Sequence, residues 1–126
     1  MNDPAPNASL VKVVGHEDSA KSLGSGALDV LGTPRLLAWL EEATCAALDL
    51  PAGFTSVGAA VELEHMVPSA VGETITVTAS VVEQTPRRVS FSVGATNAAG
   101  RDIARGRIKR AVVDAETFMA RVLAGG

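Results

Sequence analysis

The feature that most constrains the fold is a single change of hydrophobic period along the chain. Residues 35–48 contain neither glycine nor proline and are rich in good helix formers, so we expect one long helix there. Thr33 followed by Pro34 predicts its start, with Thr33 as the N-cap and Pro34 in the first turn. From Val57 onward the apolar residues recur at every second position, which is typical of half-buried strands.

Alternating segments make up most of the remaining chain. They predict strands over residues 57–67, 74–83, 88–97 and 101–113, and a further strand over 9–14 precedes the helix. Residues 15–25 are polar and contain glycine, so we expect a loop there. Asp114 is the expected N-cap of a last short helix over 115–123.

This order of elements predicts how the layers pack. A long apolar helix followed by an antiparallel meander is best buried when the sheet curls around it. We therefore expect an α+β fold in which one long central helix is wrapped by a curled antiparallel β-sheet. Such a sheet leaves one face or edge to be covered, so we also expect a homodimer.

The length and composition fit one domain with a core of small side chains. The 126 residues suit a single domain, which we expect over 9–126 after a flexible N-terminal tail at 1–8. Hydrophobic residues make up 47% and aromatic residues only 3%, so the core must be built mainly from Val, Ala, Leu and Ile.

Several classes of protein are disfavoured by the same numbers. The net charge of −3 argues against a nucleic-acid partner, and no apolar run approaches the ~20 residues that span a membrane. Two His residues and one Cys have no metal-ligand spacing, and no phosphate-binding or dinucleotide motif is present, so we expect neither metal nor cofactor. The lone Cys45 and the absence of a signal pattern lead us to expect a cytoplasmic protein.

Two titratable residues interrupt apolar rows and are the main candidates for chemistry. His65 lies in a row that we interpret as inward-facing, with Val57, Ala59, Val61, Leu63 and Val67. It is either a buried histidine bonded to backbone or a general acid or base at neutral pH. Glu41 shares a helix face with Leu37, Thr44, Cys45 and Leu48, which we interpret as more apolar than the side with Arg35, Trp39 and Glu42. Such a carboxylate lies at an edge, is paired, or is functional.

Three further positions have both a structural and a functional interpretation. Thr33 can cap the helix, and the helix N-terminus can also favour an anion or a polarised carbonyl. Gly58 marks a bulge, a close contact with the helix, or a place where a ligand approaches the backbone. Arg110 interrupts the apolar face of the last strand and is expected to reach a carboxylate or a partner subunit. Arg105, Arg107 and Lys109 share the other face, which is either solvated or meets ligand phosphates.

The order and spacing of these residues are similar to those of a known family. Asp29–Pro34, Glu41 in the helix, Val57-Gly58, Glu64-His65 and the run Ala104–Arg110 together resemble the fluoroacetyl-CoA thioesterase-like family of hotdog proteins. The resemblance extends over Ser9 to Arg121. It implies the hotdog fold, a catalytic set of Thr33, Glu41 and His65, and substrate-binding roles for Gly58 and Arg110. Ser22–Leu28 lacks the Phe residues of the fluoroacetate-selective member, so the resemblance does not extend to that selectivity.

The activity that this resemblance implies is hydrolysis of a small acyl-CoA thioester. One alternative is a non-catalytic hotdog protein that binds an acyl-CoA or related ligand without turning it over. A second alternative is a hotdog hydratase, which would need a separate Asp-His motif that we do not find. Release of thiol from an acyl-CoA separates the first activity from both alternatives.

Overall fold

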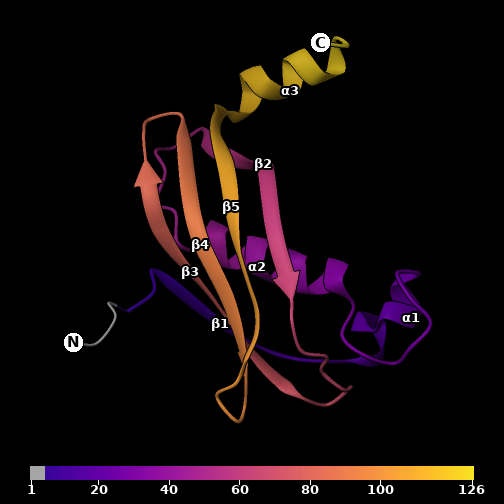
Figure 1. The fold of residues 1–126 in the computed structure, drawn as a ribbon. Helices are drawn as coiled ribbons and strands as arrows, with labels where there is room; N and C mark the ends of the chain where they lie inside the picture. Colours follow the sequence, from indigo (N-terminus) through magenta and orange to yellow (C-terminus); the bar gives the residue numbers. More distant parts are fainter. Residues whose placement is uncertain (1–4) are drawn as a thin grey trace.

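The computed structural model describes residues 5–126, in which one long helix lies against a curled five-stranded antiparallel sheet (Figure 1). The strands are β1 (Ala8–Val13), β2 (Phe54–His65), β3 (Thr74–Gln84), β4 (Arg88–Asn97) and β5 (Asp102–Asp114). The long helix is α2 (Thr33–Ala46), and α3 (Ala115–Leu123) is C-terminal. The predicted α+β class and the arrangement of helix on sheet are confirmed.

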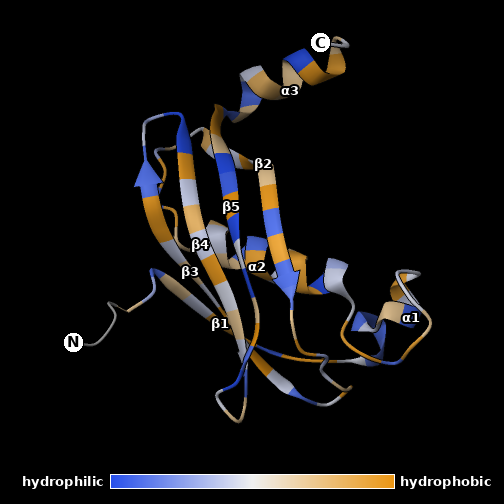
Figure 2. Cartoon of the chain, viewed as in Figure 1, coloured by the Kyte–Doolittle hydropathy of each residue, from blue (hydrophilic) through white to orange (hydrophobic). Residues whose placement is uncertain are grey.

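The sheet has the order β1-β3-β4-β5-β2, so β1 and β2 form its two edges. Orange and blue bands alternate along the strands in Figure 2, because one face of the sheet packs on α2 and the other meets solvent. The predicted bounds of β4 and α3 match the structure, whereas β2 begins three residues earlier than predicted and ends two residues earlier.

The core lies between α2 and the inner face of the sheet. Leu36, Leu40 and Ala43 of α2 are fully buried, and Trp39 and Thr44 are buried beside them. The expectation that Trp39 lies on the more polar side of the helix was therefore wrong. The buried stripe is centred on Leu36 and Leu40, so Glu41 lies at its border and not within it. Most sheet residues of the core are Val, Ile and Ala, with Phe91 as the large exception.

A β-bulge divides β2 into two halves: even-numbered residues face α2 before the bulge, and odd-numbered residues face α2 after it. Gly58 pairs with Arg110 and Ala60 pairs with Lys109, so Ala59 is an extra residue without a partner in β5. Before the bulge Ser56 and Gly58 share the face of Arg110, and after it Val61, Leu63 and His65 share the face of Ile108. The predicted inward orientation of Val57 and Ala59 was wrong for this reason, and the bulge proposed at Gly58 is confirmed.

The segment before α2 is more structured than the expected loop. It contains a 3-10 turn, η1 (His16–Asp18), and a single helical turn, α1 (Ala20–Leu23). Asp18 is buried, accepts a hydrogen bond from the Gly15 amide at 2.8 Å and pairs with Arg35 of α2 at 2.9 Å. These contacts fasten the segment to the first turn of α2.

The chain ends differ in how they are held. Of the predicted tail at 1–8, residues 1–4 lie outside the described residues, while Asn7 Oδ1 accepts a hydrogen bond from the Val81 amide and Ala8 is already in β1. At the other end α3 projects beyond the sheet (Figure 1), and Asp114 caps it as predicted, accepting from the Thr117 amide at 3.0 Å. No helix of the described residues is long and apolar enough to cross a membrane.

Candidate active site

Thr33 and His65 meet where the start of α2 lies beside the end of β2. The Thr33 Oγ1 and His65 Nδ1 atoms are 2.8 Å apart, a hydrogen-bond distance. Thr33 is not the N-cap that the sequence predicted: Gly32 holds that position without a side-chain bond, and Thr33 is the first residue of α2. Its hydroxyl is therefore directed to the imidazole. A pocket of about 240 Å³ adjoins the pair, lined by Ala20, Ser25, Val30, Leu31, Thr33, His65 and Pro68.

The imidazole of His65 is held in its neutral form. Burial lowers the pKa of His65 below its ordinary value of 6.5, and a backbone contact with Val67 opposes part of that shift. Nε2 of the ring is buried and has no hydrogen-bond partner among the described residues. A neutral ring at pH 7 with Nδ1 beside a hydroxyl has the properties of a proton acceptor.

Glu41 lies at a second polar cluster further along α2. Its Oε2 accepts a hydrogen bond from Arg110 Nη1 at 3.2 Å, and the two groups form an ion pair. Arg110 is only 6% exposed, although it carries a charge. Its Nε donates to Ser56 Oγ at 2.8 Å and its Nη2 donates to the Ser56 carbonyl at 3.0 Å. The expectation that Arg110 reaches a carboxylate is confirmed.

The Glu41 carboxylate approaches the backbone of β2 closely at Gly58. A Cβ atom at this position would lie 2.9 Å from Glu41 Oε2, closer than real Cβ contacts. Glycine therefore allows the carboxylate to approach the strand this closely, as one of the interpretations of the sequence proposed, and any larger residue would make the Glu41 side chain shift. The side chain of Glu41 is about one-third exposed, so the carboxylate is reachable from outside.

The predicted site residues therefore form two clusters in one chain and not a single one. Glu41 follows Thr33 by two turns of α2, about 12 Å along the helix axis. Gly58 lies near the middle of β2 and His65 at its end, about 20 Å apart along the strand. Among residues 5–126 no hydrogen bond or ion pair joins Glu41 to His65. Ser56 was missed by the sequence analysis, because the predicted strand began at Val57 whereas β2 begins at Phe54.

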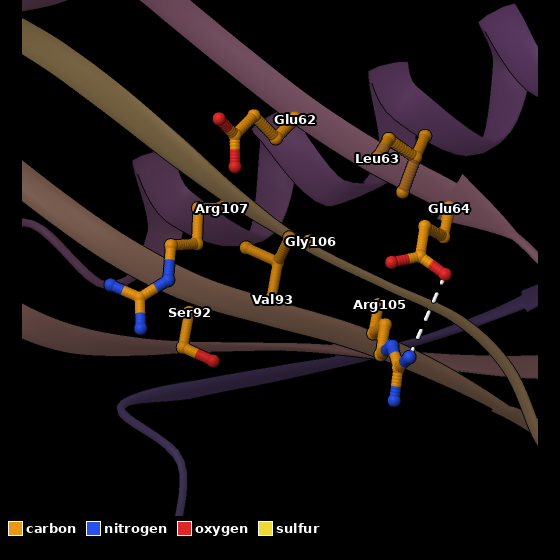
Figure 3. Close-up of a pocket in the computed structure, with 8 residues that line it drawn as sticks. All are labelled: Glu62, Leu63, Glu64, Ser92, Val93, Arg105, Gly106 and Arg107. Atoms are coloured by element: carbon orange, nitrogen blue, oxygen red, sulfur yellow. Dashed lines mark ion pairs between the residues drawn. The ribbon is translucent and has the colours of Figure 1, made fainter.

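The opposite face of the sheet carries the basic row of β5. A hollow of about 290 Å³ lies there. Figure 3 shows the residues that line it: Glu62, Leu63, Glu64, Ser92, Val93, Arg105, Gly106 and Arg107. Arg105 and Glu64 pair across it at 3.6 Å, and both are largely exposed. Glu62 lies opposite Arg107 in the strand register, so the local charges balance. This face is turned away from α2, and hence from Thr33, Glu41 and His65.

Metal chemistry has no obvious ligand set in the part of the chain that the structure describes. Within residues 5–126 no group of three or more His, Cys, Asp or Glu side chains is arranged to hold a metal ion. Thr33 Oγ1, His65 Nδ1 and Glu41 Oε2 instead take part in hydrogen bonds within the two clusters.

Solved structures define the class of fold. A mutant of the fluoroacetyl-CoA-specific thioesterase FlK has a TM-score of 0.87 and 26% identity, with 100% of each chain covered. A hot-dog-like protein from Thermanaerovibrio acidaminovorans has a TM-score of 0.83 and 28% identity, covering 92% of this chain and 87% of the other. A thioesterase superfamily member from Thermus thermophilus, at 24% identity, shares the fold with a TM-score of 0.85. The protein is thus a hotdog-fold protein.

The family is defined by sequence as well as by shape. The model of the family described as fluoroacetyl-CoA-specific thioesterase matches residues 14–116, and the chain belongs to that family. No curated protein shows significant sequence similarity to it. The prediction of a thioester hydrolase with the hotdog fold is confirmed at the level of family and fold.

Proposed function

We propose that the protein hydrolyses a small acyl-CoA thioester in a site that two copies of the chain complete together. The observation that carries the proposal is the pair of polar clusters at the residues expected from the family, Thr33–His65 and Glu41–Gly58, each formed between α2 and the same face of β2. The related thioesterase FlK has been solved with fluoroacetate and CoA, at 28% identity over 93% of this chain.

The exposed edge of strand β2 supports the proposal that a second copy of the chain completes the site. Only β5 pairs with it, and residues 58–62 in its middle are all exposed, including Val61 at 41%. An unpaired edge with an apolar centre favours addition of another strand. Antiparallel pairing about a two-fold axis near Val61 would place Gly58 of one copy opposite the His65 of the partner subunit. The two clusters would then meet across the interface.

The mechanism follows from the groups that meet there. The thioester carbonyl is polarised by the N-terminus of α2 and by the backbone at Gly58, where negative charge develops on oxygen. The Glu41 carboxylate either deprotonates the attacking water or attacks the carbonyl carbon itself, and both routes require it ionised and close. In both routes water supplies the oxygen of the acid product: it attacks the carbonyl carbon directly, or it hydrolyses the anhydride formed by attack of Glu41 and so restores the carboxylate. The C–S bond breaks with its electron pair on sulfur, and the proton lost by the water reaches the thiolate through His65, the proton acceptor beside Thr33.

The roles of the binding residues and the location follow from the same proposal. Gly58 binds the substrate through its backbone. Arg110 contributes through the carboxylate that it holds, because its guanidinium is buried against Glu41 and Ser56. The pocket of about 240 Å³ beside Thr33 suits a small acyl group. A reducing cytoplasm fits the single free cysteine, Cys45.

The activity is tested with a series of acyl-CoA esters of increasing chain length. Because Cys45 is exposed and would react with a thiol reagent, the assay uses a Cys45→Ser background or follows the thioester absorbance. Glu41→Ala and His65→Ala should each lower kcat/KM by about 10²-fold or more, the usual size of a lost acid–base group. Unchanged turnover in both variants would contradict the assignment.

The shared site is tested by making a heterodimer from two inactive chains. A Glu41→Ala chain and a His65→Ala chain carry different tags and are purified through both. If the clusters meet across the interface, one of the two sites retains both residues, and the heterodimer should recover about half of the wild-type activity. If each site lies within one chain, no site is intact and the heterodimer stays inactive.

A further inference from the structure

Ser56 binds the buried guanidinium that holds the Glu41 carboxylate. Two of the three hydrogen bonds that Arg110 donates end on this one residue, at its hydroxyl and at its carbonyl oxygen. The third, from Nη1, ends on Glu41. Because a guanidinium is a rigid planar fork, fixing Nε and Nη2 on Ser56 also fixes the direction in which Nη1 points.

We infer that Ser56 is a positioning residue of the reaction, acting through Arg110 to hold the Glu41 carboxylate at the reacting position. The inference rests on the proposed function and adds to it a residue that makes no contact with substrate. Together Ser56, Arg110 and Gly58 restrict the carboxylate from two sides: Arg110 binds Oε2, and the backbone of Gly58 lies directly beneath the same atom.

The local sequence explains why a serine can do this. Ser56 and Gly58 lie two residues apart on the regular half of β2, so both face α2 and the side chain of Arg110. The serine hydroxyl is short enough to accept from Nε while the chain direction brings the Ser56 carbonyl to Nη2. A purely structural role, in which Ser56 only satisfies a buried charge, predicts a loss of stability without a specific loss of turnover.

The first experiment separates these roles by steady-state kinetics. Ser56→Ala should lower kcat about tenfold, the effect of one charge-assisted hydrogen bond, while KM stays within about twofold because Ser56 does not touch the substrate. Ser56→Thr retains the hydroxyl and should recover most of kcat. The matched control is Ser92→Ala, a strand serine on the opposite face of the sheet, which should behave as wild type.

A double variant tests whether Ser56 acts through Arg110. If it does, Ser56→Ala combined with Arg110→Met should be no slower than Arg110→Met alone, because the residue through which Ser56 acts is already absent. Multiplicative losses in the double variant, or a wild-type kcat in Ser56→Ala, would overturn the inference. Urea unfolding of each variant checks that the measured chains are folded.

A readout that needs no turnover keeps the inference separate from the proposed function. The Arg110 Nε–H, buried and bonded to Ser56 Oγ, should exchange slowly with solvent in ¹⁵N-resolved NMR spectra. Its exchange should accelerate at least about tenfold in Ser56→Ala and stay slow in Ser56→Thr. If the wild type hydrolyses no acyl-CoA, the proposed function fails, but the exchange rates still test whether Ser56 holds the Arg110 guanidinium. Equal exchange rates of the Arg110 Nε–H in all three proteins would show that Ser56 does not hold the guanidinium.

Discussion

The two polar clusters between α2 and β2, which form two separate ends of the candidate site, are built on different physical principles. At one end Thr33 and His65 share a single hydrogen bond between a hydroxyl and a neutral ring, and Thr33 is exposed. At the other end Arg110 is buried, donates three hydrogen bonds and pairs with a carboxylate. The first arrangement can gain or lose a proton at little structural cost. The second holds a fixed charge in one place and is expensive to disturb.

The largest expected difference between the two ends is in stability. Glu41→Gln is nearly isosteric but removes the charge that faces buried Arg110, and it should lower the free energy of unfolding by about 2 kcal/mol. Thr33→Val, equally isosteric, removes one exposed hydrogen bond and should cost less than about 0.5 kcal/mol. Urea unfolding at pH 7 measures both. Equal losses would show that the ends do not differ as described.

A smaller effect is expected from crowding the Glu41 end without removing any of its groups. Gly58→Ala places a methyl group 2.9 Å from Glu41 Oε2, so the carboxylate must shift away from Arg110. We expect kcat to fall about tenfold with little loss of stability, because only the end of a flexible side chain moves.

Two other glycines of the sheet serve as controls for that substitution. Gly94→Ala has its nearest neighbour at 3.6 Å, an ordinary contact, and should leave activity unchanged. Gly106→Ala would collide with the Glu62 carbonyl of the adjacent strand and should unfold the sheet edge instead. A Gly58→Ala enzyme with wild-type kcat would show that the position of the carboxylate is not critical.

The mildest test is a change of pH, which acts on His65 at the Thr33–His65 end. Because burial lowers the pKa of His65 below 6.5, the ring is neutral at pH 7 and kcat/KM should fall only as pH drops below 6.5. Stability has the same sign: the unfolded chain binds the proton first, so stability decreases as pH falls from 6.5 toward the lower folded pKa. His65→Asn should lose this part of the pH dependence in urea unfolding, and an unchanged dependence would contradict it.

Much of the fold could be predicted because the hydrophobic period is local information. The helix, the meander and the cap at Asp114 were all evident from the chain, and so were the unusual positions of Glu41 and His65. The role of Thr33 was not, because a threonine before a proline is a good N-cap and nothing local indicates a bond to His65, which lies 32 residues later at the end of β2. Ser56 was missed because the predicted strand began only at Val57, and the pairing of Ser56 with Val112 in β5 lies far away in sequence. The orientations of Val57 and Ala59 were wrong because alternation was continued through the bulge.

The extra residue at Ala59 also has a meaning for reading related sequences. Gly58 and His65 are separated by an odd number of positions, and on an uninterrupted strand such residues point to opposite sides of the sheet. A glycine and a histidine that must work on one side can keep this spacing only if one residue is added between them. Homologues that retain the odd spacing should therefore retain the irregularity, whatever residue occupies it. Deleting Ala59 to straighten the strand should move the side chains of one half of β2 to the opposite face of the sheet.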